Sequence, residues 1–501
     1  MRITKKIISS VVILLLAGVT FAQSEAPGNL PVLRVDASKL LGDFKPINGV
    51  NGGPRSTVGV FDNSEYFNAF KPPFVRLHDV PFVADGAVDI HCIFPDFSAD
   101  ETDPANYNFR KTDLYIKSII DVGSKVVFRL GESIEGGDPE LFPKFYAHPP
   151  EDYQKWARIC CNIIRHYNMG WANGFEWNIE YWEIWNEFNS RPECWSGTSE
   201  QYFELYEAAA LAIKDLDANL KVGGPTVNNS VSIDEGRDFL AFCRDRKVPV
   251  DFVSWHGYAN HPKKIMENIE KGIATVKEFG FDQAETIFDE WNYHAIPWGM
   301  KDRESKYNKG FKKTGGAPGA SFTASVLGYM QNSDLDIACY YAAMGGIFRF
   351  GFFDIHGIPK KPFYTFVAYN QLIKCGTQVE ALGSKQETGL GVVAAVNNEE
   401  KTCAVLLSNF EDETSRVVLD LKNIPIKDQL YCSEYVIDEV RSLDWDREQV
   451  LNSSDSQIIV ELPKASVRLI LLTPQSLERK PLNLFGEADR KFDEQREKQG
   501  N

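Results

Sequence analysis

The segment YWEIWNEFN, residues 181–189, joins a strand-like run to a carboxylate at its end. Four of its first five residues are aromatic or β-branched, which favours a β-strand. Burying an ionised carboxylate is costly, so a buried strand that ends in Glu187 either pairs this charge or uses it chemically. A helical pattern follows over residues 199–217, after a capping pair formed by Thr198 and Gln201. The segment therefore predicts a strand, a loop that carries Glu187, and a helix.

The same unit of strand and helix recurs along residues 44–376. Eight strand-like runs occur, at residues 47–51, 74–79, 125–132, 181–187, 221–227, 251–258, 286–292 and 337–343. Strands that alternate with helices pair in parallel through right-handed crossovers, and eight such units close into a barrel. We therefore predict an α/β fold, a (β/α)8 TIM barrel, over residues 44–376.

The pattern changes after residue 376. Short strand-like runs follow one another, separated by turn-forming or charged stretches such as NNEEK (397–401) and EDET (411–414). This pattern predicts a C-terminal β-sandwich over residues 377–476, and the run PVLRVDA within the N-terminal segment 23–43 predicts one more strand for it. Residues 477–501 are charged and poor in apolar periodicity, so we expect a loose tail there.

Residues 1–22 have the features of a secretory signal peptide. Basic residues precede an apolar run from Ile7 to Ala17, and small residues precede a cleavage site near Ala22. A membrane anchor is the alternative, but the apolar run is short for one. No later segment approaches the roughly 20 apolar residues of a membrane helix. We therefore expect a secreted or periplasmic protein that is not inserted in the membrane.

The composition excludes several classes of partner. The formal net charge is −16, whereas binding to nucleic acid or to an anionic membrane surface needs clustered Lys and Arg. The sequence contains 8 histidines and 9 cysteines, without a CxxC pair or another metal-ligand spacing. We therefore expect no nucleic-acid partner, no metal, no cofactor and no disulfide framework, and we expect most cysteines in the core.

Polar side chains stand at the carboxyl ends of the predicted barrel strands. In a (β/α)8 barrel the loops after these ends converge on one pocket. The candidates are Arg76, His78, Asp79, Glu132, Asn186, Glu187, His256, Tyr258, Asp289, Glu290 and Asn292. Glu187 and Glu290 end the fourth and seventh strands, so we expect them to face each other across the mouth of the barrel.

Hydrolysis of a sugar acetal needs such a pair of carboxyl groups. One group protonates the leaving oxygen, while the other attacks or stabilises the anomeric carbon. A separation of about 5 Å permits direct attack with retention of configuration, whereas a wider gap admits a water molecule and leads to inversion. The alternative for Glu187 and Glu290 is a structural salt bridge at the barrel rim.

Four segments, taken together, resemble the signatures of glycoside hydrolase family 39, a clan A family of retaining β-xylosidases and α-L-iduronidases. These segments are YWEIWNEFN (181–189), TIFDEWN (286–292), RLHD (76–79) and SWHGY (254–258). The resemblance implies a (β/α)8 barrel with a β-sandwich over nearly the whole mature chain. It also implies that Glu187 is the acid/base and Glu290 the nucleophile.

Further roles follow from the resemblance alone. It implies that Asn186 holds the 2-hydroxyl group of the sugar beside the nucleophile. The residues that it places around the first sugar subsite are His78, Asp79, His256 and Tyr258. Phe188 departs from the family pattern, which usually has proline after Asn-Glu, and the difference falls on the leaving-group side.

The residues themselves support the same division of roles. The expected neighbours of Glu187 are Trp182, Trp185 and Phe188, and those of Glu290 are Arg76, Tyr258 and Asn292. Apolar neighbours raise the pKa of a carboxyl group and favour a proton donor. Hydrogen-bond donors and a positive charge favour an ionised nucleophile instead. We therefore expect Glu187 to be protonated and Glu290 to be ionised.

Other acidic and aromatic residues have structural interpretations. Glu183 lies one layer deeper than Glu187, and we expect a buried ion pair with Arg76 or Arg129. Glu132 and Asp289 are interpreted as caps of loops near the mouth. The aromatic residues of segment 345–354 form either a sugar-stacking wall or a core segment under a loop. The residues concerned are Phe348, Phe350, Phe352 and Phe353.

The sequence thus predicts a secreted retaining glycosidase that acts on a glycoside or oligosaccharide and releases a terminal sugar. The resemblance favours a β-xylosidase. The alternatives are another family 39 activity, such as that of an α-L-iduronidase, arabinosidase or galactosidase, and a sugar-binding barrel without turnover.

Overall fold

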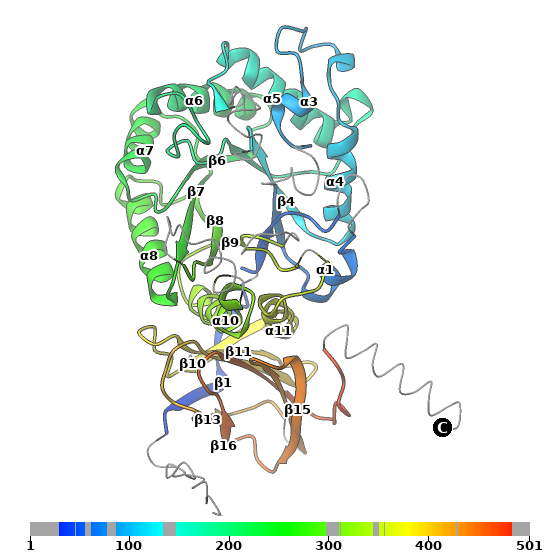
Figure 1. The fold of residues 1–501 in the computed structure, drawn as a ribbon, viewed down its shortest axis with the longest axis vertical. Coiled ribbons are helices and arrows are strands. Elements are labelled where there is room, and N and C mark those ends of the chain that lie inside the picture. The colour runs from blue at the N-terminus through cyan, green and yellow to red at the C-terminus, as the bar shows by residue number, and fades with distance from the viewer. Residues whose placement is uncertain are drawn as a thin grey trace, which may run out of the picture.

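The computed structural model describes residues 30–45, 47–55, 62–77, 87–133, 147–296, 310, 312–343, 350–354, 356–426 and 429–482. Eight parallel strands, β2 to β9, close a barrel in chain order (Figure 1). Their bounds are β2 (Gly49–Asn51), β3 (Phe74–Arg76), β4 (Lys125–Leu130), β5 (Tyr181–Ile184), β6 (Lys221–Val227), β7 (Phe252–Ala259), β8 (Glu285–Tyr293) and β9 (Ile337–Tyr340). Each overlaps one of the predicted runs, so the predicted TIM barrel is confirmed.

Helices surround the barrel on its outside (Figure 1). The α-helices are α1 (Ser64–Phe70), α3 (Ile90–Ile93), α4 (Arg110–Asp121), α5 (Tyr153–Met169), α6 (Ser199–Leu216), α7 (Asp234–Arg246), α8 (Pro262–Glu278), α10 (Ala317–Gln331) and α11 (Lys361–Cys375), and the short 3-10 helices are η2 (Pro104–Asn106) and η4 (Trp171–Asn173). The predicted capping box of α6 is present, because the Thr198 side chain accepts from the Gln201 backbone and the Gln201 side chain accepts from the Thr198 backbone.

The interior of the barrel changes from apolar to polar along the strands. Its floor is an apolar cluster formed by Phe74, Val127, Tyr181, Phe252, Ile287, Ile337 and Cys339. Side chains on one face of a strand recur every second residue. Two positions further along five of these strands stand Arg76, Arg129, Glu183, Ser254 and Asp289, all fully buried. A layer of buried polar groups therefore lies between the apolar floor and the mouth.

The C-terminal domain is one nine-stranded sheet with the order β15-β14-β17-β12-β11-β10-β1-β13-β16. Its strands are β1 (Val32–Asp43), β10 (Thr377–Leu382), β11 (Leu390–Asn397), β12 (Thr402–Asn409), β13 (Arg416–Lys422), β14 (Leu430–Ile437), β15 (Ser442–Leu451), β16 (Ser456–Glu461) and β17 (Ser466–Thr473). All neighbours pair antiparallel except β1 and β13, which pair in parallel. Hydrogen bonds thus join all the strands in one continuous sheet. Strands from both halves of the sheet share one apolar core, so the predicted C-terminal β-domain is confirmed.

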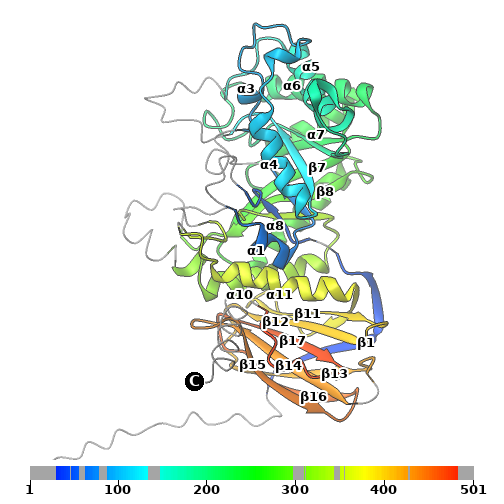
Figure 2. The same ribbon diagram turned by 90° about the vertical axis from the view of Figure 1, so that its right-hand side faces the viewer.

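Two helices join the sheet to the barrel. Figure 2 shows α10 and α11 lying across the face of β11 and β12, between the sheet and the rest of the barrel. Val393 of β11 and Leu406 of β12 belong to the same apolar core cluster as Leu327 of α10 and Phe366 of α11. Because α10 packs on both sides, every residue from Gly319 to Gln331 is buried, which removes the one-sided apolar pattern of a surface helix.

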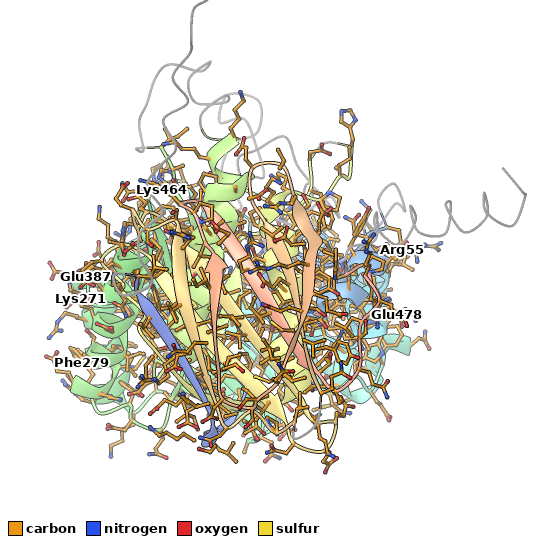
Figure 3. The ribbon with its side chains drawn as sticks, turned by 90° about the horizontal axis from the view of Figure 1, so that it is seen from below. Arg55, Lys271, Phe279, Glu387, Lys464 and Glu478 are labelled. Atoms are coloured by element: carbon orange, nitrogen blue, oxygen red, sulfur yellow. The ribbon has the colours of Figure 1, made fainter. Side chains whose placement is uncertain are left out.

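The opposite face of the sheet has an apolar core of its own, which includes Leu33, Val392, Leu407, Leu419 and Ile470. Seen from the sheet end of the molecule, the strands lie in front of the barrel helices (Figure 3). The accessory domain therefore uses both faces of its sheet, one against the barrel helices and the other for its own core.

Several sequence predictions fall on other parts of the chain. The predicted signal peptide and residues 483–501 of the predicted tail lie outside the described residues. Among the described helices, none is long and apolar enough to cross a membrane. All nine cysteines lie in the described ranges as free thiols, and seven of them are buried.

Candidate active site

Glu187 and Glu290 meet at the carboxyl ends of β5 and β8. One carboxylate oxygen of each residue and one ring nitrogen of His256 lie within 4.8 Å of one another. The Glu187 side chain is 13% exposed and the Glu290 side chain 5% exposed. Carboxyl groups of retaining glycosidases lie about 5 Å apart, and those of inverting enzymes lie at least about 6.5 Å apart. The observed approach thus matches direct attack by one carboxylate.

Local backbone geometry brings Glu187 to the mouth. The strand ends at Ile184, after which Trp185 (φ 70°) and Glu187 (φ 43°) adopt the left-handed conformation. The Glu187 N–H donates to the Thr226 carbonyl at 3.0 Å. Such conformations cost of order 1–3 kcal/mol each in non-glycine residues and persist only when their surroundings hold them.

Gly131, at the end of β4, makes room for this turn. The Trp185 N–H donates to the Leu130 carbonyl at 2.6 Å. A Cβ atom on Gly131, whose φ is +151°, would lie 3.0 Å from the Trp185 Cα atom. The close approach of these two backbones therefore depends on glycine.

Polar groups hold the Glu187 carboxylate. His256 Nδ1 lies 2.7 Å from Oε1, and the Ser190 hydroxyl donates to Oε2 at 3.1 Å. The Cys194 thiol lies 3.6 Å from the same Oε2. Ser190 and Cys194 were not expected from the sequence, because both follow the strand end and only the path of the loop returns them to Glu187.

The aromatic neighbours expected for Glu187 face away from it. Trp182 stacks on Phe128 with ring centroids 5.0 Å apart, and Phe188 stacks on Tyr202 of α6 at 4.1 Å. Trp185 packs edge-to-face against Trp195, with ring centroids 4.9 Å apart. The expectation of an apolar environment was wrong, because alternation along β5 turns Trp182 outward, toward the helices, and the loop turns the other two rings in the same direction.

Among the described residues, Tyr258 and Arg76 donate to the Glu290 carboxylate. The Tyr258 hydroxyl donates to Oε2 at 2.7 Å, and Arg76 Nη1 donates to Oε1 at 2.9 Å. Two of the three expected neighbours of Glu290 therefore contact it. Asn292, the third expected neighbour, donates instead to the backbone carbonyl of Tyr341, so that expectation was wrong.

Arg76 joins Glu290 and Asn186 to the buried layer below them. Its Nε donates to Glu183 Oε2 at 2.6 Å and lies 3.1 Å from Asp289 Oδ2. Its Nη2 donates to the Asn186 side-chain oxygen at 2.8 Å. The predicted ion pair between Glu183 and Arg76 is therefore confirmed, and it is completely buried.

Glu183 and Asp289 form a second, deeper acidic pair. Within the described ranges, Glu183 Oε1 and both oxygens of Asp289 have no hydrogen-bond partner. Burial raises the pKa of Glu183 to about 8, and the Asp289 charge acts in the same direction. Burial also opposes ionisation of Asp289, but Arg76 and His256 outweigh it and hold its pKa below the ordinary value. At neutral pH the pair therefore carries one proton, on Glu183, which can bond to Asp289.

His256 lies between the two pairs. Its Nδ1 lies 3.5 Å from Glu290 Oε2, and its Nε2 lies 3.7 Å from Asp289 Oδ2. Burial alone lowers the pKa of His256, but the negative charges of Glu290 and Asp289 outweigh burial and raise it well above its ordinary value. The imidazolium form then donates its Nδ1 proton toward Glu187.

The structure brings six of the predicted site residues together, namely Arg76, Asn186, Glu187, His256, Tyr258 and Glu290. The other two, His78 and Asp79, lie outside the described residues. Asn51 was missed by the sequence analysis, and its side-chain oxygen accepts from Arg76 Nη1 at 3.2 Å.

A second cluster of Asp89, His91 and Glu132 lies at the end of β4. Glu132 Oε1 accepts the His91 backbone N–H at 3.1 Å, and its other oxygen contacts the His91 ring. Burial raises the pKa of Glu132 to about 7, and the His91 pKa rises to about 11 because bonds to Cys92 and Glu132 outweigh burial. Glu132 thus caps the start of α3, as its structural interpretation predicted.

Two groups of side chains have the ligand spacing of a metal site. One is Glu187 with His256 and Glu290, and the other is Asp89 with His91 and Glu132. In each group, however, an arginine already pairs with one carboxylate, Arg76 with Glu290 and Arg129 with Asp89. A histidine nitrogen also already contacts a glutamate in each group. These internal pairs neutralise the ligands that a cation would need.

The aromatic residues after β9 were interpreted either as a sugar-stacking wall or as a core segment, and the structure places them differently from one another. Phe352 and Phe353 are fully buried, and Phe352 stacks on Tyr340 with ring centroids 5.0 Å apart. Phe350 lies 5.2 Å from the ring of Tyr258, near Glu290. Phe348 lies outside the described residues. Phe352 and Phe353 are therefore core residues, and Phe350 remains beside the site.

Comparisons with known proteins agree with this arrangement. The family model for glycosyl hydrolases family 39 matches residues 87–439. A β-xylosidase from Caldicellulosiruptor saccharolyticus is 26% identical over 374 residues, covering 67% of this chain and 70% of that protein. A β-xylosidase from Geobacillus stearothermophilus is 28% identical over 290 residues, covering 53% of this chain and 56% of that protein. The crystal structure of a glucosidase from Croceicoccus marinus superposes with a TM-score of 0.76 at 23% identity, covering 89% of this chain and 99% of that one.

Proposed function

Because the chain belongs to glycosyl hydrolase family 39, a family of retaining enzymes, we propose that it releases a terminal sugar by double displacement, with Glu290 as nucleophile and Glu187 as acid/base. The observation that carries this proposal is the approach of the two carboxylates within 4.8 Å. A β-D-xyloside is the proposed substrate, since two relatives similar to this chain are named β-xylosidases.

In the first step Glu290 attacks the anomeric carbon, the bond to the leaving oxygen breaks, and Glu187 gives that oxygen its proton. The Tyr258 hydroxyl and the Arg76 guanidinium hold the Glu290 carboxyl group in place for this attack. The Asn186 side-chain oxygen already accepts a hydrogen bond from Arg76. The Asn186 NH2 group is thereby left to donate to the sugar 2-hydroxyl, a region where hydrogen bonds strengthen in the transition state.

The second step depends on a change in the charge of Glu290. While Glu290 is negative, its proximity favours a proton on Glu187 and on His256. Formation of the glycosyl ester on Glu290 removes that negative charge. The proton affinity of Glu187 then falls, so Glu187 stays ionised after it has donated and can act as a general base. It takes a proton from the attacking water, whose oxygen bonds to the anomeric carbon while the ester bond breaks and returns the Glu290 carboxylate, with net retention.

A panel of 4-nitrophenyl glycosides tests the substrate, and Glu290→Ala tests the mechanism. We expect the β-xyloside to be hydrolysed fastest and the variant to lose at least about 10⁴-fold in kcat. Azide should restore sugar release by Glu290→Ala and form the α-glycosyl azide. Faster hydrolysis of an α-L-iduronide, arabinoside or galactoside would replace the xyloside assignment, and a lack of hydrolysis of any glycoside would indicate a binding protein.

We also propose that the protein is exported, because residues 1–22 have the pattern of a signal peptide. Expression of the full chain in a bacterial host with N-terminal sequencing of the mature product tests this. We expect the mature protein to begin at Gln23, outside the cytoplasm. A product that keeps Met1 and stays in the cytoplasm would contradict export.

A further inference from the structure

A polar groove of about 490 Å³ lies beside the catalytic candidates. It is lined by residues 229–233 after β6, residues 258–260 at the end of β7, the first turns of α8, and residues 294–295 after β8. Its volume falls in the range of about 300–1,000 Å³ that is typical of small-molecule sites. The contacts described so far assign no role to this groove.

Tyr258 connects the groove to the nucleophile candidate. The residue lines the groove, and its hydroxyl donates to Glu290 Oε2 at 2.7 Å. One side of this single residue therefore contacts the reacting carboxylate, and the rest of it contributes to the groove wall. The groove therefore shares Tyr258 with the reacting carboxylate.

The loop that carries Asn229 also connects the groove to the acid/base candidate. Asn228, the preceding residue, receives a hydrogen bond from Asn189 and donates its own N–H to the Asn189 side chain at 2.9 Å. Its side chain donates to Ser190 at 3.0 Å, and Ser190 in turn donates to Glu187 at 3.1 Å. The leaving group departs on the side of the acid, so it departs on the side of this loop.

The groove has the chemistry that a neutral sugar requires. Six amide and hydroxyl side chains line it, those of Asn229, Ser230, Ser232, Tyr258, Asn260 and Asn268. Amides both donate and accept, as sugar hydroxyl groups do. The charged side chains in the lining are of both signs, Lys264, Glu267 and Lys271, and all three stand exposed on α8. Figure 3 shows Lys271 at the outer edge of the molecule. A polyanion would meet no concentrated positive charge here.

Two of the lining side chains are held in place before any ligand binds. Trp255 Nε1 donates to the Asn268 side-chain oxygen at 3.0 Å, and the Asn268 NH2 group donates to the Asn229 side-chain oxygen at 3.3 Å. A fixed set of polar groups loses little conformational entropy when a ligand binds.

We propose that this groove binds the leaving-group sugar of an oligosaccharide substrate, with Asn229 and Asn260 as hydrogen-bonding partners of its hydroxyl groups. The assignment rests on the proposed glycosidase function and extends it to the leaving-group side of the site. It makes the enzyme selective for oligosaccharides over glycosides with a small leaving group.

The test compares two substrates that differ only in the leaving group. β-Xylosyl fluoride has a one-atom leaving group that cannot fill the groove, whereas xylotriose leaves a disaccharide. Asn229 has a φ of 80°, so Asn229→Gly removes its amide without adding backbone strain. Asn260→Ala removes the second amide. We expect the double variant to reduce the ratio of kcat/KM for xylotriose to kcat/KM for the fluoride by about 10- to 100-fold, as for two lost hydrogen bonds.

Glu270→Ala is the matched control. Glu270 stands on the same helix, α8, but lines a different groove, of about 650 Å³, between the barrel and the sheet domain. Its replacement should leave the substrate ratio unchanged. An unchanged ratio in the double variant, or an equal loss on both substrates, would overturn the leaving-group assignment while the glycosidase function stands. An intact enzyme that hydrolyses neither substrate would overturn the xylosidase function, and this assignment with it.

Discussion

The strands β5 and β8 each lead to two acidic residues, at two depths. The upper pair, Glu187 and Glu290, is 13% and 5% exposed, whereas Glu183 and Asp289 below it are fully buried. Arg76 contacts Glu290 of the upper pair and both members of the lower one. Tyr258, Ser190 and His256 also contact the upper pair, and all three can exchange or share protons.

The difference between the two pairs shows that depth decides what a carboxyl group can do. The upper pair can reach a substrate, and its own negative charge is stabilised by hydrogen-bond donors that can exchange or share protons. The lower pair cannot reach a substrate, and its unpaired oxygens require a stored proton. The lower pair and Arg76 therefore form a fixed charge distribution under the reacting groups. Four changes test this division, from the largest expected effect to the smallest.

Of these four changes, Glu187→Ala should have the largest effect on activity, because it removes the acid of the upper pair. Loss of a general acid costs about 10²- to 10⁴-fold in rate, and the cost is largest for a leaving group that needs protonation. We expect kcat/KM for xylobiose to fall by about this factor, and kcat/KM for 2,4-dinitrophenyl β-xyloside to fall much less. Steady-state kinetics on both substrates measures the difference. Equal losses on the two substrates would show that Glu187 is not the acid.

Arg76→Met removes the charge that the two pairs share. It leaves buried carboxylates without their partner, and breaking a buried ion pair in this way costs about 3–5 kcal/mol. Urea denaturation at pH 7 should therefore show a large loss in the free energy of unfolding. The double variant Arg76→Met/Glu183→Gln should recover part of that loss, because it leaves one buried acid fewer. Purely additive losses would mean that Glu183 does not depend on Arg76.

Glu183→Gln tests the proton held by the lower pair. The folded-state pKa of Glu183, about 8, lies above its ordinary value of 4.5. The folded protein therefore keeps a proton that the unfolded chain releases, and the stabilisation present below pH 4.5 is lost as pH rises toward 8. The stability of the wild type relative to Glu183→Gln should fall by a few kcal/mol, about 1.4 per pKa unit, over this interval.

Denaturation curves of both proteins between pH 4.5 and 8 measure this difference. A constant difference across the interval would show that Glu183 is ionised throughout. Activity is the second readout. Because the glutamine amide closely replaces the protonated acid, Glu183→Gln should retain most of the kcat at pH 7. Glu183→Ala should not, because it leaves Arg76 Nε without this acceptor.

Glu132→Gln should have the smallest effect, although Glu132 belongs to a cluster similar in composition to the catalytic one. Its carboxylate caps the His91 N–H at the start of α3, and loss of a cap costs about 0.5–2 kcal/mol. We expect a lower melting temperature and kinetic constants within about twofold of the wild type. A loss of activity comparable with that of Glu187→Ala would place Glu132 in the reaction.

The barrel was predictable from the amino-acid sequence because its signal is local. Each of the eight strands is an apolar run between turn signals, and the polar residues at the strand ends predicted the meeting of Glu187 with Glu290. The strand order within the accessory domain was less predictable. Its order depends on pairings such as β12 with β17, which join distant segments and leave no mark on either strand.

The neighbours of each site residue were the least predictable part. Phe188 is next to Glu187 in the chain, yet it stacks on Tyr202 of α6. Asn292 is two residues from Glu290, yet it bonds to the backbone after β9. Proximity in sequence therefore identified which residues reach the mouth, but side-chain direction and loop paths determine what they contact there.

The position of β1 has a consequence for biosynthesis. Its Val32–Asp36 segment pairs in parallel with Val418–Lys422, and Arg34 pairs with Leu382 on the other side, so a strand made first lies inside a sheet made last. On the ribosome, which adds about 5–20 residues per second, this strand emerges long before its two partners exist. A fragment that starts at β10 would also expose the unpaired edges of β10 and β13, so this accessory domain cannot be transplanted as a C-terminal module without its first strand.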